Sequence, residues 1–107
     1  MPVQKGDLID EGKQYDQSCR MVVEVLEGGA GFSKIDCCGN ELTEADKVSA
    51  AAEMERAGSD DVTGVIIDES KNNPDSCGLK IKVVAGGAGL SSITCCGNTL
   101  TIANDAV

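Results

Sequence analysis

The sequence contains no histidine and no tryptophan, and only one tyrosine and one phenylalanine. Without histidine, Ser18 and Ser76 lack the imidazole base that a serine nucleophile needs, which argues against this kind of catalysis. With so few aromatic side chains, the core must be built mainly from Val, Ile, Leu and Ala, and in short units such a core is thin. The chain therefore needs a staple such as a metal, disulfides or association with a partner.

Basic residues are also scarce: 9 Lys and Arg stand against 18 Asp and Glu, which gives a formal net charge of -9. Nucleic acids and anionic membranes are bound by clustered basic side chains, so neither is an expected partner. A partner protein with a basic docking surface is the electrostatic complement of this chain.

Long apolar runs are absent as well. No stretch approaches the length of a membrane span, and the first residues show no apolar segment of a secretory signal. We therefore expect no membrane insertion and a cytoplasmic location. In that reducing compartment, clustered cysteines are more often metal ligands or redox groups than structural disulfides.

The chain does contain an internal repeat. Residues 6–45 align with residues 64–103 without a gap, and about half of the aligned pairs are identical, which indicates duplication of one structural unit. Each copy holds one isolated cysteine followed by an adjacent pair. The six cysteines are Cys19, Cys37 and Cys38 in the first copy, and Cys77, Cys95 and Cys96 in the second.

The pattern within each copy predicts strands. Residues 21–27 and 79–85 are rich in β-branched side chains, and the GGAG motif after each of them favours a tight turn. Residues 32–38 and 90–96 are predicted to return as the second strand of a hairpin. Such a hairpin would bring the isolated cysteine of each copy towards the adjacent pair. The glycine after each pair permits the turn that two neighbouring cysteines need to chelate one ion.

A helix is predicted between the copies. Residues 44–57 are rich in Ala and Glu, and Thr43 is suited to the N-cap position. The expected organisation is a first repeat over residues 1–43, a helical linker over residues 44–63 and a second repeat over residues 64–107. The fold class is mainly β, with two small units in tandem joined by one helix.

Each copy resembles desulforedoxin, a small rubredoxin-type iron protein, and the desulforedoxin-like N-terminal domain of desulfoferrodoxin. The isolated cysteine, the strand and glycine-rich turn at residues 22–31 and 81–89, and the CCGNEL and CCGNTL motifs at residues 37–42 and 95–100 carry the resemblance. It covers both repeats and leaves out the linker. It implies a small β fold with one mononuclear iron per unit, held by four cysteine thiolates. It also implies pairing of two units, here within one chain about a pseudo-twofold axis.

The copies depart from this family at one ligand. The family has a C-x-x-C motif before the adjacent pair, whereas Asp16 and Pro74 stand three positions before Cys19 and Cys77. A carboxylate could complete each set of three thiolates: Asp16 in the first copy, and Asp75, which follows Pro74, in the second.

Several occupants of such a site stay open. We expect mononuclear, thiolate-ligated iron, and iron and zinc both accept an oxygen ligand. An iron–sulfur cluster with one iron ligated from outside, or a trigonal Cu(I), is also compatible with three thiolates. Alternatively, the copies hold no metal and keep free thiols or a disulfide on a retained scaffold.

Catalytic groups are not evident in either copy. The acidic pairs Asp10 with Glu11, and Asp68 with Glu69, occur in both repeats and are expected at the exposed edge of a hairpin. We therefore predict that the protein is not an enzyme. The expected function is that of a small metalloprotein for electron transport, or an accessory subunit of a larger redox complex. The alternative is a structural or interaction subunit, with zinc, disulfides or no metal, that stabilises a partner enzyme.

Overall fold

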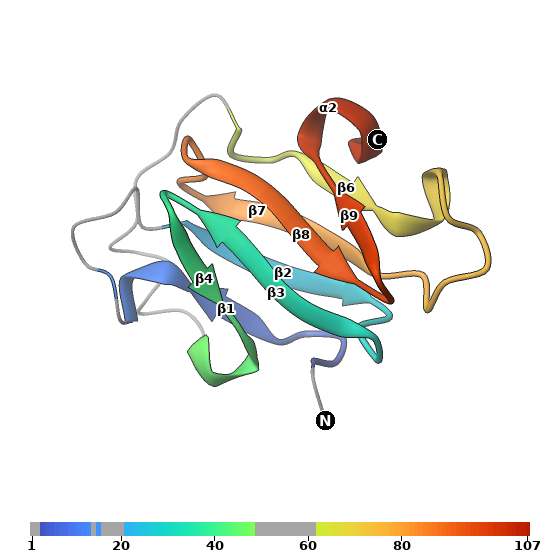
Figure 1. Ribbon diagram of the computed structural model, residues 1–107. Helices are drawn as coiled ribbons and strands as arrows, with labels where there is room; N and C mark the ends of the chain where they lie inside the picture. The colour runs from blue at the N-terminus through green and yellow to red at the C-terminus, as the bar shows by residue number, and fades with distance from the viewer. Residues whose placement is uncertain (1–2, 14, 16–20, 49–61) are drawn as a thin grey trace.

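The computed structural model describes residues 3–13, 15, 21–48 and 62–107. Its architecture is mainly β, as predicted, and consists of two antiparallel sheets stacked face to face (Figure 1). The first sheet has the strand order β5-β1-β2-β7-β6, and the second has the order β4-β3-β8-β9. In both sheets the strands of the first repeat therefore lie on one side and those of the second repeat on the other, and the two repeats share one core.

Most strands are short. The first sheet contains β1 (Leu8–Asp10), β2 (Val22–Glu27), β5 (Lys47–Val48), β6 (Ile66–Asp68) and β7 (Lys80–Ala85). The second contains β3 (Phe32–Cys37), β4 (Asn40–Leu42), β8 (Leu90–Cys95) and β9 (Asn98–Leu100). Among the described residues, the helical elements are three 3-10 turns, η1 (Glu11–Lys13), η2 (Glu44–Asp46) and η3 (Glu69–Lys71), and the short helix α2 (Ile102–Asp105). No helix in the described part of the chain has the length and apolarity needed to cross a membrane.

The predicted strand segments are confirmed, but the predicted hairpins are wrong. β2 pairs with β1 and β7 in the first sheet, whereas β3 pairs with β4 and β8 in the second. The GGAG segment between β2 and β3 thus carries the chain from one sheet to the other. The physical reason lies in burial: Val23 and Ile35 both lie in the main core, and stacking the two segments in different sheets buries both of them.

The central strand pairs join the two repeats. Glu24 in β2 lies opposite Lys82 in β7, and Ile35 in β3 lies opposite Ile93 in β8. In the sequence alignment of the repeats, both pairs occupy equivalent positions. The two repeats therefore meet through the same strands in each sheet.

The opposed side chains of Ile35 and Ile93 offer a test of the shared core. Both are 0% exposed, and replacing a buried isoleucine by alanine costs about 2–5 kcal/mol. We expect Ile35→Ala to lower the free energy of unfolding by about 3 kcal/mol in urea under reducing conditions. Ser33→Ala, on the exposed side of the same strand, should change it by less than about 0.5 kcal/mol. Equal effects of the two substitutions would contradict this core.

The helix predicted over residues 44–57 does not form at its start. Thr43 is an N-cap, as predicted: its hydroxyl accepts a hydrogen bond from the Ala45 N–H at 3.2 Å, and its own N–H donates to Asp46 at 2.8 Å. The helical turn η2 nevertheless ends at Asp46, because the next two residues form β5 and pair with β1. Residues 49–61, with the rest of the predicted helix, lie outside the described residues.

Candidate metal centre

The second cysteine of each adjacent pair lies in a two-residue hairpin turn, directly after the strand that ends at the first cysteine. In the second repeat, Cys95 pairs with Asn98, and the turn between them consists of Cys96 and Gly97, with φ of 54° and 74°. Positive φ at both central positions defines a type I′ turn, in which a cysteine is an uncommon, strained choice. The turn after the cysteine pair was predicted and is confirmed. It sends the two side chains in different directions, so that Cys95 is buried and Cys96 is exposed.

A buried glutamate lies beside this turn. Asp68 at the end of β6 accepts a hydrogen bond from the Ser70 N–H at 2.9 Å and so caps η3, whose first residue is Glu69. The Glu69 side chain is 0% exposed, and so is that of Glu11 in the first repeat. The prediction that the acidic pairs lie at an exposed edge is therefore wrong for both glutamates, and also for Asp10, which is 3% exposed.

Hydrogen bonds hold the Glu69 carboxylate in place. Its Oε2 accepts from the Asn98 side chain at 3.0 Å, and its Oε1 accepts from the Leu79 N–H at 3.3 Å. Burial raises the pKa of Glu69, but hydrogen bonds from Asn98, Ser76, the Leu79 N–H and Cys95 outweigh this effect and leave the pKa below its usual value. The carboxylate is therefore held in its ionised form.

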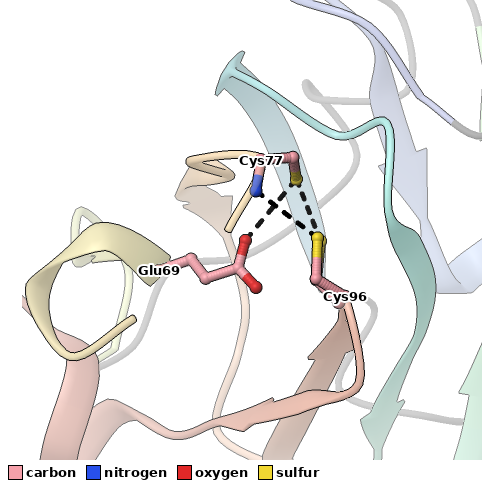
Figure 2. Close-up of side chains that lie close together, drawn as sticks. Glu69, Cys77 and Cys96 are labelled. Carbon is pink, nitrogen blue, oxygen red and sulfur yellow. Dashed lines mark hydrogen bonds between the residues drawn. The ribbon is translucent and has the colours of Figure 1, made fainter. Parts of the chain in front are cut away.

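Three sulfur atoms converge on this carboxylate. Cys77 Sγ lies 3.5 Å from Glu69 Oε1 and 3.4 Å from Cys95 Sγ, and Cys95 Sγ lies 3.8 Å from Cys96 Sγ. One ligand atom from each of these four residues lies within 4.8 Å of the other three. Figure 2 shows Glu69, Cys77 and Cys96 pointing towards one another from η3, the loop that follows it and the β8–β9 turn. In a tetrahedral site with metal–sulfur bonds of about 2.3 Å, ligand atoms are about 3.8 Å apart. The cluster therefore has the donor set and spacing to hold a metal ion.

The first repeat contains a similar group. Glu11, Cys37 and Cys38 lie within the same 4.8 Å limit, and the two sulfurs are 3.9 Å apart. The Glu11 carboxylate accepts from the Asn40 side chain at 3.1 Å and from the Met21 N–H at 3.3 Å. The arrangement around Glu69 thus recurs around Glu11.

The remaining predicted ligands are Cys19, Asp16 and Asp75. Cys19 and Asp16 are outside the described residues. Asp75 is exposed and lines an open surface pocket together with Cys96, but it is not one of the four groups that form the cluster. The structure thus brings together the three predicted sulfurs of the second repeat, with Glu69 as the neighbouring carboxylate.

Sequence reasoning missed Glu69 and Glu11 because they stand further from the isolated cysteine than the C-x-x-C spacing allows. Two acidic residues in succession also look like surface residues. One feature of the sequence points to both glutamates: Glu11 aligns with Glu69, and Asn40 aligns with Asn98, when the two repeats are compared.

The electrostatic environment differs between the thiols. Burial raises the pKa of Cys77, but hydrogen bonds from the Gly31 and Gly29 N–H groups and from the neighbouring thiols outweigh it, so the pKa is lower than usual. Burial also raises the pKa of Cys95 far above its usual value, and the nearby Cys77 and Glu69 groups raise it further. Metal binding would release the Cys95 proton, since a ligating cysteine is a thiolate.

Each glycine-rich turn lies against the cysteine turn of the opposite repeat. The Cys96 N–H donates to the Gly31 carbonyl at 2.8 Å, and the Cys38 N–H donates to the Gly89 carbonyl at 2.8 Å. A Cβ atom at Gly31 would overlap the Cys96 sulfur, and one at Gly89 would overlap the Cys38 sulfur. The GGAG motif was predicted to be a hairpin turn. In the structure it forms part of the wall of the cysteine cluster.

Comparisons with family models, with curated proteins and with solved structures give no match for this chain. The fold and the site define the class: a small two-sheet β protein with clustered cysteine and glutamate side chains that could hold a metal ion.

Proposed function

We propose that this chain is a small non-catalytic metalloprotein that holds one mononuclear iron per repeat through cysteine thiolates and transfers electrons to or from a larger redox partner. The observation that carries the proposal is the convergence of the sulfurs of Cys77, Cys95 and Cys96 in one cluster. Thiolate ligands suit iron, and the N–H groups of Gly29 and Gly31 directed at Cys77 are of the kind that tune a reduction potential.

The position of the cluster supports electron transfer. Cys95 lies in the main core, which restricts the movement of ligands between oxidation states. Cys96 is exposed, so a partner could approach within a short distance of a bound ion. The net charge of -9 would direct the protein towards a basic docking surface.

The repeats are further proposed to be desulforedoxin-like units paired about a pseudo-twofold axis within one chain. The antiparallel pairs Glu24 with Lys82 and Ile35 with Ile93 support this, because each joins equivalent positions of the two repeats. A twofold axis that runs through both sheets would pass close to both pairs.

Metal and acid-labile sulfide content, with the visible spectrum of anaerobically purified protein, tests this function. The expected result is one iron per repeat without sulfide, and a red ferric protein that bleaches reversibly on reduction. Iron with an equal amount of sulfide would replace the mononuclear centre by a cluster. Protein that takes up no metal and has its thiols paired would overturn the proposal.

A structural role with zinc is the second candidate. The observation that favours it is that the cluster links the β8–β9 turn of the second sheet to η3, which directly follows β6 of the first sheet, around the core residue Cys95. A colourless protein with one zinc per repeat and no redox response would support this role.

A further inference from the structure

We infer that Glu69 is the fourth ligand of the second-repeat centre, so that the ion is held by three thiolates and one carboxylate, and that Glu11 is its counterpart beside Cys37 and Cys38. The inference rests on the proposed metal centre and identifies the group that completes it. It replaces the carboxylates of Asp75 and Asp16, which the sequence suggested for this position.

The first argument is position. Glu69 Oε1 is 3.5 Å from Cys77 Sγ, and the four donor atoms lie within 4.8 Å of one another, as the corners of one coordination sphere should. The Asn98 side chain binds the other oxygen, Oε2, at 3.0 Å. Such outer hydrogen bonds orient a ligating carboxylate towards its ion. Asp75, by contrast, is exposed and not among the four groups.

The second argument is burial. The Glu69 side chain is 0% exposed, and a carboxyl group in such a position needs hydrogen bonds or a cation as partners. In the described part of the chain, the ion pairs of Lys34, Lys47 and Lys80 are made with acidic residues other than Glu69. The ligand atoms nearest to Glu69 are instead the sulfurs of the cluster, and a metal cation is the partner that this donor set fits.

The third argument is recurrence. Glu11 has the same partners as Glu69: an asparagine from the strand after the cysteine turn, a backbone N–H at 3.3 Å, and two adjacent cysteine sulfurs. About half of the aligned positions differ between the repeats, yet this set is the same in both. A surface carboxylate without a shared role would not need these partners twice.

The donor set defines the class of ion. Three sulfurs and one oxygen suit borderline cations such as Zn²⁺, Co²⁺ and Fe²⁺ or Fe³⁺, whereas Cu(I) prefers thiolates alone. A hard anionic oxygen also stabilises the more highly charged ferric state. Replacing Glu69 by cysteine should therefore keep the metal and raise the reduction potential of an iron centre.

The test uses the full-length chain loaded with zinc and examined by X-ray absorption at the zinc edge. We expect sulfur ligands at about 2.3 Å together with an oxygen ligand at about 2.0 Å. In the double variant Glu11→Cys with Glu69→Cys, the oxygen contribution should disappear and the zinc should stay bound. A sulfur-only shell in the unaltered protein would overturn the inference while leaving the metal centre intact.

Affinity measurements identify the oxygen donor. Glu69→Ala should weaken zinc binding to the second site by at least about 100-fold in competition with a chromogenic chelator, because even outer-ligand changes cost about 10–100-fold. Glu69→Cys should restore it. Asp75→Ala, in the exposed loop, is the matched control and should leave affinity unchanged.

The outcomes separate the two proposals. Loss of affinity in Asp75→Ala but not in Glu69→Ala would overturn the inference and assign the oxygen to Asp75. Failure of the unaltered chain to bind zinc or iron would instead overturn the metal centre itself, and the inference with it. A general folding defect is recognised because circular dichroism would then change in Glu69→Ala and cysteine would not rescue binding.

Discussion

Removal of the metal is expected to lower the melting temperature of the protein by about 10 °C or more. A ligand present at 100 times its dissociation constant stabilises the folded state by about 2.7 kcal/mol per site. In a domain of this size, each kcal/mol shifts the melting temperature by about 4–8 °C. The ion would also bind both partners of the long hydrogen bond that the Cys77 thiol donates to the buried Glu69 carboxylate at 3.5 Å.

Scanning calorimetry on metal-loaded and chelator-treated protein, both kept reduced, measures this difference. Adding back zinc should restore the higher melting temperature. Cys95→Ser, which removes a buried ligand of the second site, should reduce the response to the chelator by about half because one site remains. An unchanged melting temperature after complete loss of the metal would contradict a stabilising centre.

The strand segments could be predicted from the sequence because their local pattern is strong. Residues 22–27 and 80–85 carry β-branched side chains, and these form β2 and β7. The turn after each cysteine pair was also predictable, since Gly39 and Gly97 can adopt a positive φ. Both features depend on neighbouring residues alone.

The pairing of the strands could not be predicted in the same way. A hairpin and a crossing between sheets use the same apolar segments joined by the same GGAG, and they differ only in which long-range contacts they make. Val22 and Val23 are adjacent apolar residues, and such a run is typical of a strand covered on both faces. In the structure both are buried, so this run was a local sign against a simple hairpin. The helix predicted over residues 44–57 is cut short after Asp46 for a similar reason. Pairing of β5 with β1 is a tertiary contact, and it outweighs local helix propensity.

The carboxylate of the site was the larger omission. Glu69 follows Asp68, and two acids in a row are usually solvent-exposed. Its burial depends on Asn98 and Leu79, which lie far along the chain and meet it only in the folded protein. Comparing the two repeats position by position, rather than extending the family's ligand spacing, would have singled it out.

Gly31→Ala is expected to release the ion from the opposite repeat. The φ of Gly31 is not positive, so alanine strains the backbone little, but the added methyl group would overlap the Cys96 sulfur. Overpacking of this kind costs about 1–3 kcal/mol, which corresponds to roughly a tenfold to hundredfold loss of affinity. When free metal is buffered close to the dissociation constant of the unaltered protein, the content per chain should fall by about half, and Gly31→Ala combined with Gly89→Ala should leave both sites largely empty.

Ala30→Ser is the matched control, because it lies in the same turn with its side chain exposed. If the GGAG motif served only as a flexible connection, Gly31→Ala would be as harmless as Ala30→Ser, and the metal content would not change. The Cys96 N–H donates to the Gly31 carbonyl at 2.8 Å. If a substitution in the first repeat removes the ion of the second repeat, residues of both repeats contribute to that one site. Neither repeat could then hold its ion at full affinity alone, so the function would require both copies in a single chain.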